Sequence, residues 1–289
     1  MQFVWHKKKS SFLLILIVAL SLALMLAIGP MFETARERIF DAYASRYGLQ
    51  HGSLFYLDAE KIEMLRQREE DLTVGLFSNY GQWTLRETEQ PLTLGLFTQE
   101  AITLGKLRLL EGQFPQSEKE IVLEQNSVQY RCPEGTKVGD TLTFSQGKTE
   151  LQVRLVGILA DYVGNWESFS SDSLIEGVND FPRGLLGGEV PSKRKTQGAL
   201  VYFRQYDPAV DGDRIVQLSQ EINQTNDFTY DYVPNDKLYV QVEQEIMQPF
   251  RSFRRLMVGI VMLGGALIMF VSAGLYINRY RESYAMLHV

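Results

Sequence analysis

The chain has 289 residues, a formal net charge of -6, 45% hydrophobic residues, 22% charged residues and a single cysteine. This length suffices for one or two domains with a sizeable core, and one cysteine excludes an intramolecular disulfide. The acidic balance gives no argument for nucleic-acid binding, and we expect no nucleic-acid partner.

Two runs without a charged side chain, residues 10–32 and 256–278, dominate the hydropathy pattern. About 20 helical residues cross the hydrocarbon core of a bilayer, so both runs are long enough. We predict transmembrane helices over residues 11–32 and 256–277. The first run is longer than the apolar region of a secretory signal and no clear cleavage site follows it, which favours an uncleaved helix over a signal peptide.

Basic residues next to the two runs predict the orientation. Lysines at 7–9 precede the first run and two arginines follow the second, so the rule that Lys and Arg stay inside predicts cytoplasmic tails over 1–10 and 278–289. The protein would be a multi-pass protein of the plasma membrane with its middle part outside. Arginines on the predicted outer side oppose this rule, and they could pair with anionic lipid headgroups: Arg36, Arg38, Arg251, Arg254 and Arg255.

Helical periodicity continues the first membrane helix as a stalk over residues 33–46. Residues 47–234 then mix strand and helix patterns. Asp58 is placed to cap a helix that begins at residue 59. Further patterns predict strands over 53–57, 72–77, 92–97, 120–123, 140–145, 151–159, 199–204 and 228–233, and helices over 59–70 and 211–224.

The strings "LTVGLF" and "LTLGLF" at 72–77 and 92–97 are nearly identical, and we predict that they are strands of one sheet. Residues 164–198 are rich in Gly, Ser, Asp and Pro with little periodicity, which predicts a long mobile loop. Residues 235–255 read as a second stalk helix, in which Pro249 marks a kink or a new start. The predicted fold class is an α+β extracytoplasmic domain between two transmembrane helices with helical stalks.

Few residues suggest chemistry. Three histidines and one cysteine cannot build a structural zinc set, and the chain has neither a phosphate-binding loop nor a hydrolase elbow. We therefore expect no catalytic, cofactor or metal site. Aromatic residues at the start of the predicted loop either contact a ligand or pack the loop on the core, and the second interpretation is favoured: Tyr162, Trp166 and Phe169.

Several short strings in a fixed order resemble the MacB/FtsX-like ABC transporter permeases, in their extracytoplasmic core domain and flanking helices. The matching positions are Gly112, Pro115, Glu120–Leu123, Val138–Thr141, Val156–Ile158, Arg279, Arg281, Glu282, Tyr284, Ala285, Met286 and Leu287. His288 stands where the family usually has a basic residue. The resemblance covers nearly the whole chain except residues 164–198.

The resemblance implies a permease subunit, or the N-terminal part of one, because the family usually continues with more membrane helices. It implies that ATP is hydrolysed by a separate cytosolic ATPase, so this chain itself is no enzyme. It implies contact of that ATPase with Arg279, Arg281, Glu282, Tyr284, Met286 and Leu287. The further expected partners are a second permease chain or half and the lipid bilayer. The work done would be export, extraction or signalling.

Another interpretation stays open from the residues alone. The chain could be a free-standing two-helix receptor or adaptor that binds an extracellular peptide or lipid. A surface enzyme is less favoured, because no catalytic motif supports it.

Overall fold

The computed structural model describes residues 2–166, 181–192, 194–206, 211, 213–223, 232–242 and 246–285. Side chains are not described at 2–14, 17, 18, 21, 22, 24, 25, 275, 276 and 278–285. The chain divides into two compact units. Unit 1 comprises Met1–Phe40 and Glu243–Val289, and unit 2 is Asp41–Val242.

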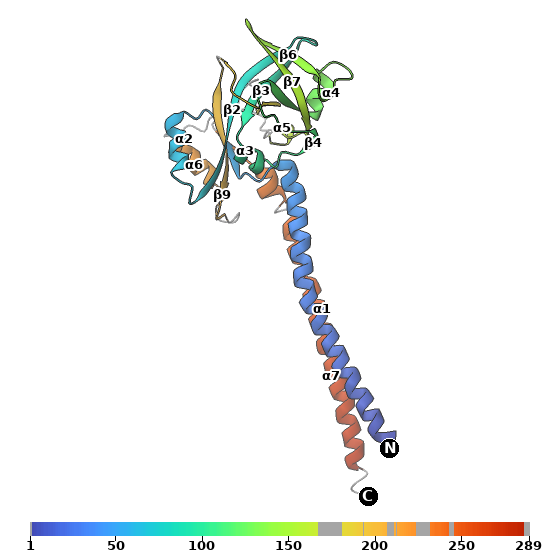
Figure 1. Ribbon diagram of the computed structural model, residues 1–289. Coiled ribbons are helices and arrows are strands. Elements are labelled where there is room, and N and C mark those ends of the chain that lie inside the picture. Colours follow the sequence, from blue (N-terminus) through green and yellow to red (C-terminus); the bar gives the residue numbers. More distant parts are fainter. Residues whose placement is uncertain are drawn as a thin grey trace. The chain divides into compact units, whose positions relative to one another are not determined.

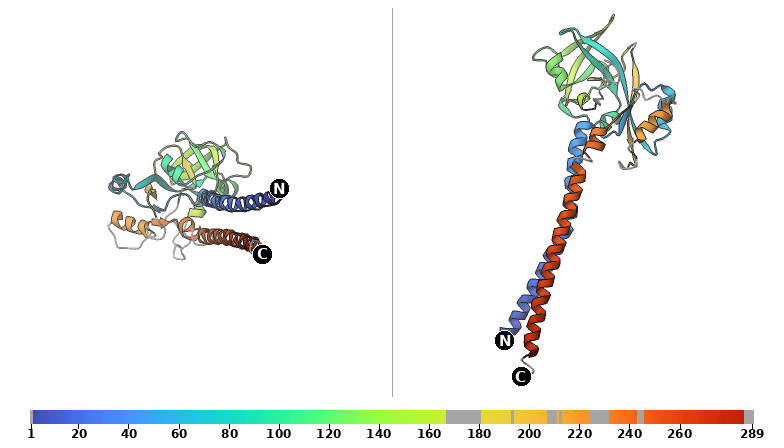
Figure 2. Two further views of the ribbon diagram at one scale, coloured as in Figure 1. Left: turned by 90° about the horizontal axis from the view of Figure 1, so that it is seen from below. Right: turned by 180° about the vertical axis from the view of Figure 1, so that it is seen from behind.

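Two long helices form unit 1. Helix α1 (Gln2–Tyr47) runs from unit 1 into unit 2, and helix α7 (Gln248–Ala285) lies wholly in unit 1. Figures 1 and 2 show the unit 1 part of α1 and α7 side by side and antiparallel, so the start of α1 and the end of α7 are at the same end of the pair. Residues 33–46 are helical, as predicted, because α1 continues through them, and their role as a stalk stays a prediction.

Helix α7 carries one apolar stretch of membrane-spanning length, Gln248–Gly274, with mean hydropathy 2.4 and none of its most apolar window buried. Among the residues that the structure describes, no second helix meets the same criteria. The first predicted membrane helix, 11–32, is helical in α1, but many of its side chains lie outside the description. A second span therefore stays a prediction.

Pro249 occupies the second position of α7. A proline fits the first turn of a helix because the N–H that it lacks would have no partner there. Residues 246 and 247, directly before α7, are π-helical, so a kink or a new start at Pro249 stays a prediction. The preceding part of the second stalk is the π-helix η1 (Lys237–Gln241), and residues 243–245 between η1 and α7 lie outside the description.

Unit 2 is built on a ten-stranded mixed sheet with the order β10-β1-β9-β2-β3-β8-β5-β7-β4, and β6 pairs with β2 and β7. The strands are β1 (Gly52–Leu54), β2 (Leu72–Leu85), β3 (Gln90–Phe97), β4 (Leu109–Gly112), β5 (Glu120–Glu124), β6 (Thr141–Gln146), β7 (Thr149–Leu159), β8 (Gly184–Leu186), β9 (Thr196–Phe203) and β10 (Tyr232–Pro234). The two similar strings lie in β2 and β3, which pair antiparallel with Phe77 opposite Phe97. The prediction that they share one sheet is confirmed.

Short helices complete unit 2: α2 (Ala59–Arg66), α3 (Gln99–Leu104), α4 (Gln125–Arg131), α5 (Val163–Trp166) and α6 (Arg214–Asn223). As predicted, Asp58 caps α2, because its carboxylate accepts the Lys61 N–H at 2.9 Å. Figure 1 shows α2 and α6 together beside β9, and their apolar residues form one core cluster with β1, β2 and β9. Two further clusters fill the rest of the sheet.

The prediction of a mobile loop over 164–198 is wrong for part of that range. β8 lies inside the sheet, parallel to β3 and antiparallel to β5, and β9 begins at Thr196. Phe181, Leu185 and Leu186 are each at most 2% exposed. Three-residue strands show no readable alternation, so only long-range pairing reveals β8. Residues 167–180 lie outside the description.

Candidate functional site

The short strings between residues 112 and 158, which carry part of the family resemblance, come together in unit 2. Strand β7 pairs with β4 on one side, where Gly112 is opposite Gly157, and with β5 on the other, where Val122 is opposite Gly157. Val156–Ile158 therefore lies between the two other strings. Their order along the chain reflects one local arrangement of three strands.

Gly112 is required by this arrangement. Its φ of 78° is in the left-handed region, and a Cβ built on it would lie 2.1 Å from the carbonyl oxygen of Val156. A Cβ on Gly157 would lie 2.7 Å from the carbonyl oxygen of Gln113. The backbone leaving β4 stays bound to β7, because the Gln113 N–H donates to Val156 O at 2.9 Å. Both glycines permit a close approach of two backbones.

The string at 138–141 forms a tight turn against the same strand. The Gly139 N–H donates to Leu155 O at 2.7 Å, and the Leu155 N–H donates to Asp140 O at 2.8 Å. The Asp140 carboxylate accepts the Lys137 N–H at 2.8 Å, which closes the turn. These contacts are structural, since the turn leads from the segment after α4 into β6, which begins at Thr141.

Glu120 supports this arrangement from β5. Its carboxylate accepts the Gln116 N–H at 2.8 Å and pairs with the Arg154 guanidinium at 2.7 Å. These two donors, first the Gln116 N–H and then Arg154, lower the pKa of Glu120. The resembling residues thus hold a fold together and bring no reactive side chains into one place.

Two of the aromatic residues considered for ligand contact, Tyr162 and Trp166, are inside the core. Tyr162 is 4% and Trp166 6% exposed, and their rings are 4.8 Å apart among Phe97 and Phe181. The Tyr162 hydroxyl donates to the carbonyl of Pro182. Tyr162 and Trp166 therefore pack on the core, which is the interpretation that the sequence favoured over ligand contact. Phe169 lies outside the described residues.

Glu124 is a buried carboxylate that the sequence did not indicate. It is 1% exposed, and one of its oxygens accepts the N–H groups of Tyr162 and Val163 at 2.7 and 2.8 Å. Its other oxygen pairs with Arg183 at 3.2 Å. Burial raises the pKa of Glu124, while the two N–H donors and Arg183 oppose that rise. The carboxylate joins the end of β5 to the first turn of α5.

The residues expected to contact an ATPase lie in the last turns of α7 and beyond its end. Arg279, Arg281, Glu282 and Tyr284 belong to α7 by their backbone, but their side chains are not described. Met286 and Leu287 lie outside the described residues. The predicted contact is therefore neither supported nor opposed by the structure.

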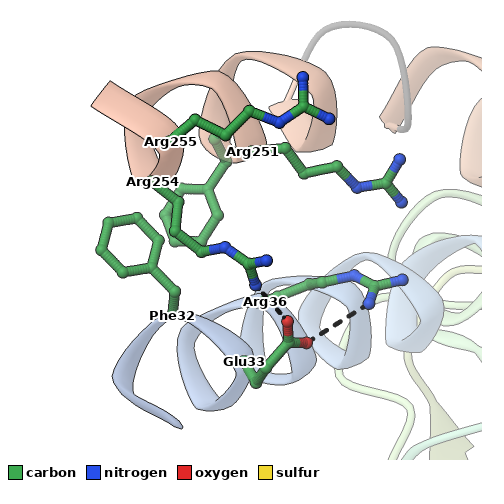
Figure 3. Close-up of a pocket in the computed structure, with 7 residues that line it drawn as sticks. Phe32, Glu33, Arg36, Arg251, Arg254 and Arg255 are labelled. Atoms are coloured by element: carbon green, nitrogen blue, oxygen red, sulfur yellow. Dashed lines mark hydrogen bonds and ion pairs between the residues drawn. The ribbon is translucent and has the colours of Figure 1, made fainter. Parts of the chain in front are cut away.

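A basic pocket lies in unit 1, between facing stretches of the two long helices. It encloses about 120 Å³ and is lined by Phe32, Glu33 and Arg36 from α1 and by Phe250, Arg251, Arg254 and Arg255 from α7. We call this group the arginine pocket. Figure 3 shows Arg254 reaching from α7 to Glu33 on α1, 2.6 Å between Nη1 and Oε1. Four arginines and one carboxylate therefore line the arginine pocket.

Aromatic rings form the apolar side of the arginine pocket. The Phe32 ring is 4.9 Å from the Phe250 ring and 6.1 Å from the Phe253 ring, and Phe32 is 6% exposed. Helical periodicity explains the arrangement, because side chains three and four residues apart share one helix face. Phe250, Arg251, Arg254 and Arg255 thereby line one side of α7.

Comparison with known proteins gives little further identification. No protein-family model matches the chain, and no curated protein matches it. Among solved structures, a domain of a protein assigned as a permease from Porphyromonas gingivalis aligns with TM-score 0.34 and 10% identity, over 64% of this chain and 76% of that one. The extracellular domain of the noncanonic ABC-type transporter YknZ from Gram-positive bacteria aligns with TM-score 0.37 and 13% identity, over 64% and 98%. Both scores are below 0.5, so nothing is inferred from these two alignments.

Proposed function

We propose that the chain is a permease-type subunit of an ABC transporter in the plasma membrane. In this proposal unit 2 is the extracytoplasmic domain, α1 and α7 cross the bilayer, and both tails are cytoplasmic. The single observation that carries it is the meeting of three family-like strings at one arrangement of three strands, in which a Cβ on residue 112 would lie 2.1 Å from a backbone oxygen of β7. Chance similarity of short strings would not predict such a meeting.

The arrangement of unit 1 supports the membrane part of the proposal. α7 is apolar over a membrane length, and its large side chains are exposed along it, as in Leu263 at 73% and Phe270 at 80%. Exposed apolar side chains over such a length fit contact with lipid. The antiparallel pairing of α1 and α7 brings both tails to one end, which two spans require (Figures 1 and 2).

The proposed mechanism is mechanical coupling. A separate ATPase binds and hydrolyses ATP and moves the segment that contains Arg279 and Glu282. Helix α7 carries that motion through the bilayer, and α1, which is shared by both units, carries it into unit 2. Export, extraction and signalling are all compatible with such a movement.

Co-purification tests the proposal. The full chain is purified from membranes of its own cell, and bound proteins are identified together with vanadate-sensitive ATP hydrolysis. We expect a protein with a phosphate-binding loop that hydrolyses ATP. Removal of residues 282–289 should abolish this contact, since the coupling segment is lost.

The matched control changes the other tail. Removal of residues 2–5 shortens the tail on the same predicted side of the membrane, keeps the lysines at 7–9 that set the orientation, and should leave the ATPase bound. Full recovery of the ATPase after removal of residues 282–289 would contradict the coupling role. Absence of any ATPase from the unmodified chain would favour the receptor or adaptor interpretation instead.

A further inference from the structure

The arginine pocket has more positive than negative groups, and its one carboxylate is already shared. Glu33 pairs with Arg254 at 2.6 Å and with Arg36 at 3.5 Å. Arg255 has no hydrogen-bond or ion-pair partner among the side chains that are described. Arg36, Arg254 and Arg255 thus have one described carboxylate among them, and an additional anion in the pocket would reduce the repulsion among these three guanidinium groups.

Guanidinium groups suit one class of anion. Their planar donors match the oxygens of phosphate in pairs, and they lose water more readily than an ammonium group does. Figure 3 shows the guanidinium groups of Arg36 and Arg251 extending in the same direction from the two facing helices, beyond the Glu33–Arg254 pair. The volume of about 120 Å³ is several times that needed for one water molecule, so an anion with several oxygens fits.

The position of the pocket along α7 indicates the source of the phosphate. The uncharged run 256–278 begins directly after Arg255, and Leu256 and Ile260 are 57% and 56% exposed. On α1, Leu26 and Met31 are 76% and 65% exposed just before the pocket residues. Apolar surface on one side and arginines on the other is the pattern of the boundary between acyl chains and headgroups.

The pocket also has an apolar wall of its own. The contacting rings of Phe32 and Phe250 keep water from one side of the charged groups, which strengthens their attraction for an anion. Binding of a phosphate would require Arg254 to leave Glu33 or to contact both groups at once. The Arg254–Glu33 ion pair is partly exposed, with the side chains 42% and 49% exposed, so it is weak. A competing phosphate can therefore join without a large cost.

We propose that the arginine pocket binds the phosphate of one anionic phospholipid and holds α1 and α7 together at the outer surface of the membrane. This inference rests on the part of the proposed function that places α7 in a bilayer. Arg251 and Arg255 contact the phosphate oxygens, and Arg36 and Arg254 share their charge between Glu33 and the lipid. The acyl chains lie along the exposed apolar surface of α7.

The test titrates the full chain, purified in neutral detergent, with dioleoyl phosphatidylglycerol and counts bound lipids by native mass spectrometry. A basic residue near an anionic surface contributes about fivefold in affinity, so Arg251→Gln with Arg255→Gln should weaken the tightest lipid site about 30-fold. Arg38→Gln is the matched control, because Arg38 is an exposed arginine of α1 that does not line the pocket. It should bind as the unmodified chain does.

Further arms separate the alternatives. Arg251→Lys with Arg255→Lys keeps both charges and should retain more affinity than the glutamine variant, which also guards against misfolding as the cause. Dioleoyl phosphatidylcholine should bind weakly to all variants. Equal lipid affinity in the unmodified chain and the glutamine variant would overturn the inference. Equal affinity for glycerol phosphate and the lipid would also overturn it, since the pocket would then bind a soluble anion.

Failure of this inference is distinguishable from failure of the proposed function. If an ATPase co-purifies and the glutamine variant binds lipid as the unmodified chain does, only the proposed lipid site is contradicted. If lipid binding depends on Arg251 and Arg255 but no ATPase co-purifies, only the proposed transporter role is contradicted.

Discussion

His51 shows how a single buried side chain makes unit 2 sensitive to pH. It is 6% exposed, its Nδ1 accepts the Phe203 N–H at 3.0 Å, and the rings of Tyr206 and Tyr239 are 3.9 and 4.1 Å away. Burial, and secondly the charge of Arg214, lower the pKa of His51 from 6.5 to about 3, against a smaller opposing effect of Asp211. The folded chain therefore keeps this imidazole neutral.

The pH dependence of stability follows from that pKa. Between about pH 6.5 and pH 3 the unfolded chain binds a proton at His51 and the folded chain does not, so this contribution to stability falls as pH decreases. In urea unfolding of the full chain in detergent, followed by tryptophan fluorescence, we expect the stability advantage over His51→Asn to be about 2 kcal/mol smaller at pH 5 than at pH 8. Asparagine keeps an acceptor for the Phe203 N–H but does not titrate. Parallel pH profiles of the two proteins would contradict the assignment.

At the scale of elements, the pairing of β4 with β7 depends on a close approach of two backbones at Gly112. Gly112 and Gly135 both have left-handed φ angles, 78° and 82°. A Cβ on Gly112 would lie 2.1 Å from the Val156 carbonyl oxygen, whereas a Cβ on Gly135 would meet nothing within 4 Å. A substitution at Gly135 therefore tests backbone strain alone, whereas the same substitution at Gly112 tests backbone strain together with a steric collision.

Gly112→Ala should cost more than Gly135→Ala. In the control, Gly135→Ala, the free energy of unfolding should fall only by the strain of an alanine in the left-handed region, about 1 kcal/mol. Gly112→Ala adds a backbone collision that can be relieved only by separating β4 from β7, so we expect a loss above 3 kcal/mol. Urea unfolding of both variants checks this, and similar losses in the two would show that the β4–β7 contact is not as close as the structure has it.

Elements with clear periodicity could be predicted from the sequence, and elements defined by distant partners could not. Helix α2 could be predicted from its capping residue Asp58 and from its composition. Strands β6 and β7 could be predicted from their alternating apolar residues on either side of a turn at Gly147. Strand β8 has three residues, and only its pairing with β3 and β5 makes it a strand. Helix α3 and strand β4 were missed for the same reason, since six and four residues carry too little pattern.

The candidate sites divide in the same way. The sequence indicated that Arg251, Arg254 and Arg255 could meet lipid headgroups, because they adjoin an apolar run. It did not indicate the pair between Arg254 and Glu33, which requires α1 and α7 to lie together although 221 residues separate the two positions. The burial of Glu124 was equally hidden, since its partners are donated by α5 and by Arg183.

At the scale of the whole chain, charge and helix pairing bear on the membrane topology. The rule that basic residues stay inside is opposed by the outer arginines, but Arg36 and Arg254 are paired with Glu33. The rule counts Lys and Arg near the membrane whether or not they are paired, so the pairs explain how these arginines are tolerated rather than reverse the count. The antiparallel pairing of α1 with α7 in unit 1 places both tails at one end, which fits two spans and cytoplasmic tails (Figure 1).

The native cysteine permits a direct test of this topology. Cys132 is 8% exposed, and burial raises the pKa of its thiol to about 11, so little reactive thiolate is present near neutral pH. The unmodified chain should therefore resist a membrane-impermeant maleimide in intact cells. Lys148→Cys places a thiol in the exposed turn between β6 and β7 and should be labelled rapidly.

Thiols in the two tails complete the experiment. Lys8→Cys and Ser283→Cys should stay unlabelled in intact cells and become labelled when the membrane is permeabilised, because the proposal places both inside. Labelling of only one tail in intact cells would mean a single span, and the helix between the labelled tail and unit 2 would then not cross the bilayer. Labelling of both tails with protection at residue 148 would reverse the orientation. In that case unit 2 would face the ATPase directly, and coupling through α7 would have no role.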